Sequence, residues 1–269
     1  MSLKIEDLFS VKGKVVLVTG GSRGVGEMIA RGYVANGARV YVSSRKADVC
    51  EAIAAELSRE GECFAIPADL SRMGEIERVA AELKSRESKL DVLVNNAGAT
   101  WGESVDAFSE KGWDRVMDLN VKSLFFLTQK LLPLLEAAAS EAHPARVINI
   151  GSIDGLQASP TESFSYSASK AAVHQLTKHL ARHVSSRHIL VNAIAPGFFP
   201  SAMTAWLKEY VPAMKKHIPL QRTGGVEDIA GTALYLSSRA SGYTTGAIIV
   251  VDGGLLAASR DELDGEKLV

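Results

Sequence analysis

A tyrosine and a lysine four residues apart, Tyr166 and Lys170, are the residues in this sequence best suited to proton transfer, and Ser152 lies fourteen residues before the tyrosine. Residues four apart share one face of a helix, so both side chains can reach one cleft. A neighbouring ammonium favours the phenolate, and we therefore expect Lys170 to lower the pKa of Tyr166 toward neutral. The phenol could then exchange a proton with a substrate oxygen held by the Ser152 hydroxyl. A tyrosine followed by a lysine four residues later also occurs by chance on exposed helix faces. Whether this pair is catalytic therefore depends on the rest of the chain.

Short β-branched runs alternate with helical patterns along the whole chain. Buried strands separated by helices predict a parallel sheet covered on both faces, so we expect one α/β domain over residues 1–269 with a Rossmann-like, doubly wound sheet of seven strands. Two segments break the alternation: the apolar, proline-containing 198–222, expected to cover the substrate, and the polar 259–269, expected to fray. The expected strands are 15–18, 40–42, 64–66, 92–94, 147–150, 189–191 and 248–251.

Composition narrows the ligand classes. The chain has 30 basic and 31 acidic residues, which favours neither a nucleic-acid groove nor a polybasic membrane surface. Cys50 and Cys63 lack metal-ligand spacing, so we expect free thiols and no metal. No run approaches the ~20 apolar residues of a membrane span, and the first ten residues do not resemble a signal peptide. A cytoplasmic protein with a small-molecule ligand is the expectation.

A glycine-rich turn directly follows the first expected strand. Residues 19–26 read Thr-Gly-Gly-Ser-Arg-Gly-Val-Gly and lead into a helix. Glycines at this junction let backbone N–H groups and the positive helix end approach a pyrophosphate. The position at the first strand-to-helix crossing favours a dinucleotide site over a turn that only packs helix on strand. The residues expected to bind there are Gly20, Ser22, Arg23, Gly24, Val25 and Gly26.

The end of the second expected strand indicates which dinucleotide binds. An NAD site places an acidic residue there for the ribose 2′-hydroxyl, whereas residues 43–46 read Ser-Ser-Arg-Lys. Arg45 and Arg23 could hold a 2′-phosphate through charge-assisted hydrogen bonds, with Ser44 beside them. A solvated arginine at a helix start is the alternative for Arg45, but the missing carboxylate independently favours NADP(H).

Several motifs occur in the order typical of one family, and together they span about residues 11–254. The sequence resembles the short-chain dehydrogenase/reductases, a Rossmann-fold family of NAD(P)-dependent oxidoreductases. Residues 96–102 and 196–204 are most similar to its 3-oxoacyl-[acyl-carrier-protein] reductases, in particular the branch linked to rhamnolipid synthesis. The matching motifs are the turn at 19–26, Asp69-Leu70, Asn95-Asn96-Ala97-Gly98, Asn120, Ser152, Tyr166, Lys170 and Pro196-Gly197.

The resemblance implies a role for each matching residue. Tyr166 would protonate a carbonyl oxygen that Ser152 positions, and Lys170 would hold the nicotinamide ribose and lower the tyrosine pKa. Asn120 would anchor a water that passes protons to Lys170, whereas a helical asparagine bonded locally is the alternative. The other implied cofactor contacts are Asp69 and Leu70 near the adenine, Asn96, Ala97 and Gly98 near the adenosine ribose, and Pro196 and Gly197 against the nicotinamide.

The apolar character of residues 198–218 favours an apolar substrate, either a 3-oxoacyl thioester or a similar ketone. We expect Trp101, Phe199, Met203 and Trp206 to border it. A lid whose apolar face packs on the domain is the alternative.

The thioester carrier would be an acyl carrier protein or coenzyme A. Arg187 falls where carrier-protein reductases present a basic residue beside the cleft, but His143 replaces another expected arginine.

The resemblance also implies a homotetramer or homodimer through helices at about 113–138 and 167–184, although packing on the protein's own sheet would explain their alanines and leucines equally well.

Two other functions use the same motifs. An NADP-dependent dehydrogenase of a secondary alcohol, polyol, sugar or steroid would run the reaction in reverse. A non-catalytic dinucleotide-sensing protein shares the fold, but it would be expected to lose the tyrosine, lysine or serine, and all three are present. We therefore favour an NADPH-dependent carbonyl reductase.

Overall fold

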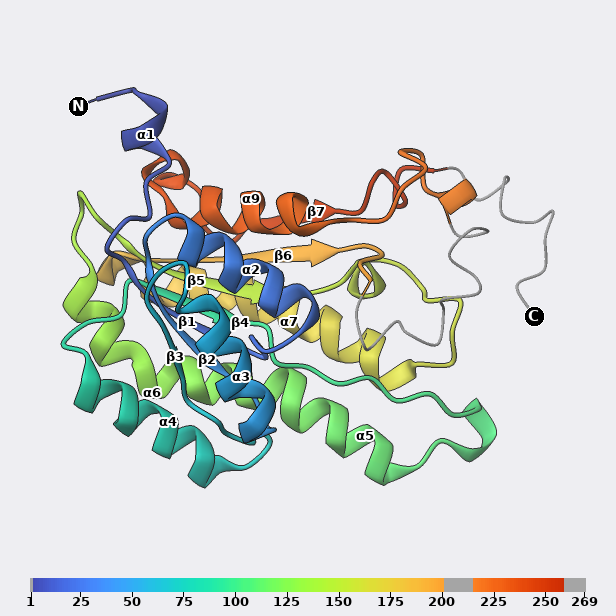
Figure 1. The fold of residues 1–269 in the computed structure, drawn as a ribbon. Helices are drawn as coiled ribbons and strands as arrows, with labels where there is room; N and C mark the ends of the chain where they lie inside the picture. Colours follow the sequence, from blue (N-terminus) through green and yellow to red (C-terminus); the bar gives the residue numbers. More distant parts are fainter. Residues whose placement is uncertain (1, 201–214, 259–269) are drawn as a thin grey trace.

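The computed structural model describes residues 2–200 and 215–258 (Figure 1). Their seven parallel strands form one sheet in the order β3-β2-β1-β4-β5-β6-β7, which confirms the doubly wound, Rossmann-like domain. The expected covering segment 198–222 lies mostly outside the described residues, and the expected frayed tail 259–269 lies wholly outside them. The strands are β1 (Val15–Thr19), β2 (Arg39–Ser43), β3 (Cys63–Ala65), β4 (Val92–Asn95), β5 (Ala145–Ile150), β6 (Ile189–Pro196) and β7 (Ile248–Val251).

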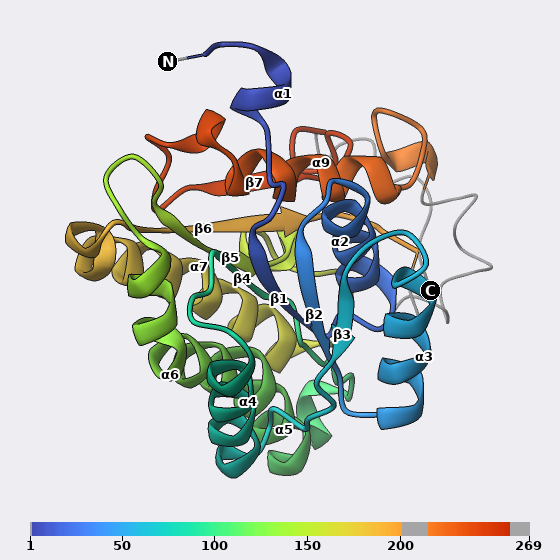
Figure 2. The same cartoon turned by 60° about the vertical axis from the view of Figure 1, so that its left-hand side comes forward.

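Helices cover both faces of the sheet, with α2, α3 and α9 on one side and α4, α6 and α7 on the other (Figure 2). None of the helices within the described ranges is long and apolar enough to cross a membrane. The α-helices are α1 (Ile5–Leu8), α2 (Gly24–Ala35), α3 (Ala47–Leu57), α4 (Met73–Arg86), α5 (Glu110–Met117), α6 (Ser123–Ala138), α7 (Phe164–Val184) and α9 (Val226–Ser237). The short helical segments are η1 (Val105–Ala107), η2 (Asp118–Lys122), η3 (Ile153–Gly155), η4 (Ser185–Arg187) and η6 (Arg239–Ser241).

Strand β1 shows why the strands read as continuous apolar runs. Val16 and Val18 pack in the core with α2, α3 and α9, while Val15 and Leu17 pack in the core with α4, α6 and α7. All five β1 residues are buried. Because successive side chains point to opposite faces, a strand covered on both faces is apolar at most positions, and in β1 only Thr19 at the end is polar.

The helix expected at 113–138 is interrupted. It consists of α5 and α6 joined by η2, a π-helical turn. A π turn changes the phase of the helix without ending it, so apolar periodicity continues on both sides and hides the interruption. The interrupted helix runs along the lower side of the molecule in Figure 1, and its π turn carries Asn120.

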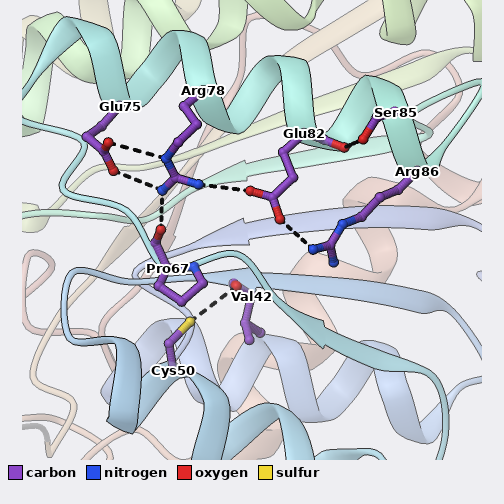
Figure 3. A network of polar contacts seen from close by, with 8 residues as sticks. All are labelled: Val42, Cys50, Pro67, Glu75, Arg78, Glu82, Ser85 and Arg86. Atoms are coloured by element: carbon purple, nitrogen blue, oxygen red, sulfur yellow. Dashed lines mark hydrogen bonds and ion pairs between the residues drawn. The ribbon is translucent and has the colours of Figure 1, made fainter.

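A network of ion pairs on α4 anchors the connection that leaves β3 (Figure 3). Arg78 pairs with Glu75 and Glu82, at 2.9 Å each, and it also donates a hydrogen bond to the Pro67 carbonyl. Exposed ion pairs contribute little stability individually. Their effect here is geometric, because Pro67 lies two residues before Asp69, an expected cofactor contact.

Both cysteines are buried free thiols, as expected. Cys50 donates to the Val42 carbonyl at 3.4 Å (Figure 3). Burial raises the pKa of Cys50 and raises that of Cys63 to about 12. Thiols held neutral in the core contribute packing rather than reactivity.

A buried hydrogen-bond ladder joins the ends of β4 and β5 to the helices that cover them. The Asn95 amide donates to Asn149 Oδ1 at 2.9 Å and to Thr128 Oγ1 at 3.0 Å. The Asn149 amide in turn donates to Thr177 Oγ1 at 2.9 Å. Every member is buried and paired, so the ladder fixes β4, β5, α6 and α7 relative to one another.

Replacing Asn149 by alanine should destabilise the fold, because Asn95 and Thr177 lose a partner while remaining buried. Each buried group left unsatisfied costs roughly 1–3 kcal/mol of unfolding free energy. Urea denaturation monitored by circular dichroism measures the loss. The matched control is Asn36→Ala, whose amide donates to the Gly32 carbonyl in an exposed position and whose loss should cost under about 1 kcal/mol. Equal losses in the two variants would contradict a stabilising role for the ladder.

Candidate active site

The glycine turn after β1 has a backbone that requires glycine at three positions. Gly20 adopts a φ of 62° and Gly24 a φ of 58°, a region that favours glycine. A Cβ at Gly26 would lie 2.3 Å from the Gly20 carbonyl oxygen. Helix α2 begins at Gly24, and no described side chain caps its first turn. The resulting cradle, with free N–H groups at a positive helix end, fits a pyrophosphate.

Asn96 braces this turn from the end of β4. Its amide donates to the Thr19 carbonyl at 2.9 Å and to the Gly20 carbonyl at 3.1 Å. The Thr19 hydroxyl accepts from the backbone N–H groups of Asn96 and Ala97 at 2.9 and 3.0 Å. Thr19 was not among the expected site residues, and its place directly before the glycines is the signal that could have identified it. Contacts of Asn96, Ala97 and Gly98 with a ribose stay a prediction.

The predicted phosphate-binding residues lie along one edge of the sheet. Thr19 and Ser43 are register partners at the ends of β1 and β2, which brings the segments carrying Arg23 and Arg45 together. Both arginines are exposed, and neither forms an ion pair with another described residue. The Ala68 N–H donates to the Ser44 carbonyl at 2.9 Å. The Asp69-Leu70 segment therefore continues the same edge.

The catalytic candidates Ser152, Tyr166 and Lys170 meet at the carboxyl end of β5. Ser152 follows β5 and begins η3, and its hydroxyl accepts from the Asp154 N–H at 3.1 Å. On α7, Lys170 donates to the Ile150 carbonyl at 2.8 Å, and its Nζ lies 5.5 Å from the centroid of the Tyr166 ring. Ser152, from the end of β5, thus shares one site with Tyr166 and Lys170 of α7.

The electrostatics of the pair differ from the expectation. Burial raises the pKa of Tyr166 to about 12, opposed by its hydrogen bond with Ser152, and Asp154 adds to the rise. Burial also lowers the pKa of Lys170 to about 8, although the Asp154 carboxylate favours the ammonium. The expectation that Lys170 brings the tyrosine pKa toward neutral is therefore wrong for the protein's own groups, because desolvation of the phenol is the largest contribution to the shift. The phenol stays protonated at neutral pH and can act as an acid.

Asn120 connects the loop after β4 to α7. Its Oδ1 accepts from the Ala99 N–H at 2.8 Å, and its amide donates to the Ala99 carbonyl at 3.0 Å and to Ser169 Oγ at 2.9 Å. These partners are distant in sequence, so the alternative of a locally bonded asparagine is wrong. These bonds attach the loop after β4 to α7 one residue before Lys170. Its anchoring of a water stays a prediction.

The residues expected around the nicotinamide and the substrate lie on different elements. Pro196 ends β6, and Gly197 donates to the Val251 carbonyl at 2.9 Å, with no space for a Cβ beside Asp252. The Trp101 ring packs against Gly112 of α5, and the Arg115 guanidinium lies 5.4 Å from its centroid. That packing leaves its substrate contact a prediction.

Phe199 is buried in the core and packs against Gly224, while Met203 and Trp206 lie outside the described residues. A cavity of about 450 Å³ adjoins Phe198 and Phe199, yet its lining includes none of Asn120, Ser152, Tyr166 and Lys170. We therefore do not assign this cavity to the substrate.

Comparison with known proteins places this fold and site in one family. Residues 20–256 match the family model described as Enoyl-(Acyl carrier protein) reductase. The chain belongs to the short-chain dehydrogenase/reductase family, which confirms the resemblance read from its motifs.

Among its relatives, the rhamnolipids biosynthesis 3-oxoacyl-[acyl-carrier-protein] reductase of Pseudomonas aeruginosa is 47% identical over 249 residues, covering 91% of this chain and 97% of that protein. The gluconate 5-dehydrogenase of Gluconobacter oxydans is 34% identical, covering 93% of this chain and 97% of that protein. The solved structure of a Pseudomonas aeruginosa RhlG/NADP active-site complex superposes with a TM-score of 0.90 at 46% identity, covering 92% of this chain and 98% of that chain.

Removing the Tyr166 hydroxyl should abolish most turnover and leave the fold intact. Tyr166→Phe deletes the proton donor, and a lost general acid lowers kcat by at least ~100-fold. Lys170→Ala should impair both turnover and cofactor binding, since we expect its side chain to contact the nicotinamide ribose as well as to support Tyr166. Steady-state kinetics, with cofactor affinity from fluorescence titration, measure these effects. More than a tenth of the original kcat in Tyr166→Phe would show that another group donates the proton.

Proposed function

We propose that the protein is an NADPH-dependent reductase of a 3-oxoacyl thioester or similarly apolar ketone. The observation that carries this proposal is the meeting of Ser152, Tyr166 and Lys170 after β5, at the sheet edge that also carries the glycine turn after β1. Burial raises the pKa of Tyr166, which keeps its phenol available as a proton donor. Bound NADPH supplies the hydride. The kinship with the Pseudomonas reductase supports the thioester substrate.

Ser152, Tyr166 and Lys170 each have a separate role in polarising the carbonyl and transferring the proton. Ser152 Oγ accepts from the Asp154 N–H, so its own proton is available to the substrate oxygen and can polarise the carbonyl. Tyr166 donates its proton to that oxygen as negative charge develops there. Lys170 is mostly charged at neutral pH, with a pKa of about 8, and stabilises the resulting phenolate.

The cofactor is NADP(H), and the glycine turn and the two arginines fit it. The turn presents N–H groups to the pyrophosphate, and Arg23 and Arg45 are exposed at the edge where the 2′-phosphate would lie. No acidic residue stands among residues 43–46 to select a 2′-hydroxyl.

NADPH should be strongly preferred over NADH, and Arg45→Asp should reduce or reverse the preference. The aspartate removes one charge-assisted bond to the 2′-phosphate, worth roughly 1.5–3 kcal/mol, and adds repulsion. The ratio of kcat/KM for the two cofactors is the measurement. Arg59→Asp, an exposed position just beyond α3, is the control and should leave the ratio unchanged. Equal kcat/KM for NADPH and NADH in the unmodified enzyme would refute the assignment.

The specificity constant for 3-oxoacyl thioesters should rise with acyl chain length until the pocket is full. Each buried methylene contributes up to ~0.8 kcal/mol of binding, which corresponds to about a fourfold increase. An assay of NADPH oxidation with thioesters of increasing length measures the trend. A flat response, together with efficient turnover of a polyol or sugar, would support the alternative of an NADP-dependent alcohol, polyol, sugar or steroid dehydrogenase.

An acyl carrier protein is the proposed carrier of the acyl group, with coenzyme A as the alternative. Within one chain, Arg187 lies just beyond the end of α7 opposite Tyr166 and pairs with Glu136 at 2.6 Å. A helix of 21 residues spans roughly 30 Å, so this arginine is not beside its own chain's cleft, contrary to the expectation. Comparing kcat/KM for one acyl chain on the two carriers distinguishes them. The homotetramer or homodimer and the cytoplasmic location stay predictions.

A further inference from the structure

His174 is a buried histidine that the proposed mechanism does not use. It lies on α7 one turn beyond Lys170 and two turns beyond Tyr166, on the stripe of the helix that faces the sheet. The side chain is 4% exposed. Neither ring nitrogen meets a described hydrogen-bond partner of good geometry. A buried polar ring without partners costs stability, so its presence requires an explanation.

The imidazole fills space left by two glycines that flank Ser152. A Cβ on Gly151 would lie 2.1 Å from His174 Nε2, and a Cβ on Gly155 would lie 2.9 Å from His174 Cε1. The loop over residues 151–155 therefore lies directly on the ring. On the other side of Ser152 in the sequence, Lys170 donates a hydrogen bond to the Ile150 carbonyl at 2.8 Å. The backbone on both sides of Ser152 therefore contacts residues of α7.

We propose that His174 is a positioning residue, whose neutral imidazole supports loop 151–155 and so sets the distance of Ser152 from Tyr166 and Lys170. This inference rests on the proposed function insofar as Ser152 must hold a substrate oxygen. A misplacement of about 1 Å in such a group can cost up to ~100-fold in rate.

The charges around the ring favour its neutral form. Burial lowers the pKa of His174 below 6.5, and the positive charges of Lys170 and Lys178 lower it further. The backbone of Gly155 raises this pKa but does not offset the burial. From η3, the Asp154 carboxylate interacts with Lys170. Protonation at acid pH would place a further cation beside Lys170 and strain the loop, so kcat should fall as the pH drops below 6.5 through the folded pKa.

Two single variants and their combination test the contact. Gly151→Ala should push the loop away from the ring, and His174→Ala should remove its support. Each should lower kcat roughly tenfold while the KM for NADPH changes less than about threefold. In the double variant the methyl group introduced at position 151 occupies the vacated space, so kcat should recover above that of Gly151→Ala alone.

Gly155→Ala is the matched control. Its Cβ would lie 2.6 Å from the Lys170 backbone carbon, so His174→Ala should not rescue it. His174→Ala should also remove the acid-side fall in kcat, whereas His143→Ala, on an exposed loop, should not.

Thermal unfolding of the same variants without substrate gives a readout that does not depend on the proposed function. We expect the two substitutions to be coupled, with a smaller loss of Tm in the double variant than the sum of the single losses. Should the enzyme reduce no ketone, the proposed function fails while this coupling still tests the contact. Additive losses of Tm, or a His174→Ala enzyme with unchanged kcat and pH profile, would overturn the inference.

Discussion

All seven strands run in the same direction, and the site depends on this constraint more than on any other. Parallel strands bring their carboxyl ends, and the starts of the segments that follow them, to one edge of the sheet. The strand order reverses between β1 and β4, so the connections after these strands leave toward opposite faces. The glycine turn, the Asn96 brace and Ser152 come from strands that are adjacent in the sheet although they lie far apart in the sequence.

The exclusion of water that stabilises the sheet also determines the protonation states of the catalytic residues. The pKa values of Tyr166 and Lys170 both shift toward the neutral forms, mainly because protein surrounds the two groups. A tyrosine held as a phenol and a lysine poised near pH 8 suit proton donation to a ketone. The serine hydroxyl and the Asp154 carboxylate adjust this balance, so the acid of the site is tuned by its loop as well as by its helix.

The sequence predicts the fold well because the central strands are buried on both faces, which produces continuous apolar runs such as residues 15–18. The glycine turn is equally easy to predict from the sequence, since its backbone leaves no room for a Cβ atom at Gly26. The hydrogen-bond partners of side chains are harder to predict. Asn96 and Asn120 bond to residues brought close by folding, and the depth of burial that raises the Tyr166 pKa depends on the whole packed domain. The π turn was hidden because apolar spacing continues through it.

That π turn makes the helix sensitive to length. Asn120 lies within η2, and its bonds to Ala99 and Ser169 require one rotational position about the helix axis. Each residue of an α-helix turns the chain by about 100°, so deleting one residue from 118–122 would regularise the helix and swing every preceding or following side chain out of phase. Length changes can therefore accumulate in the exposed connection at 139–144, whereas a single deletion in η2 would detach the loop after β4 from α7.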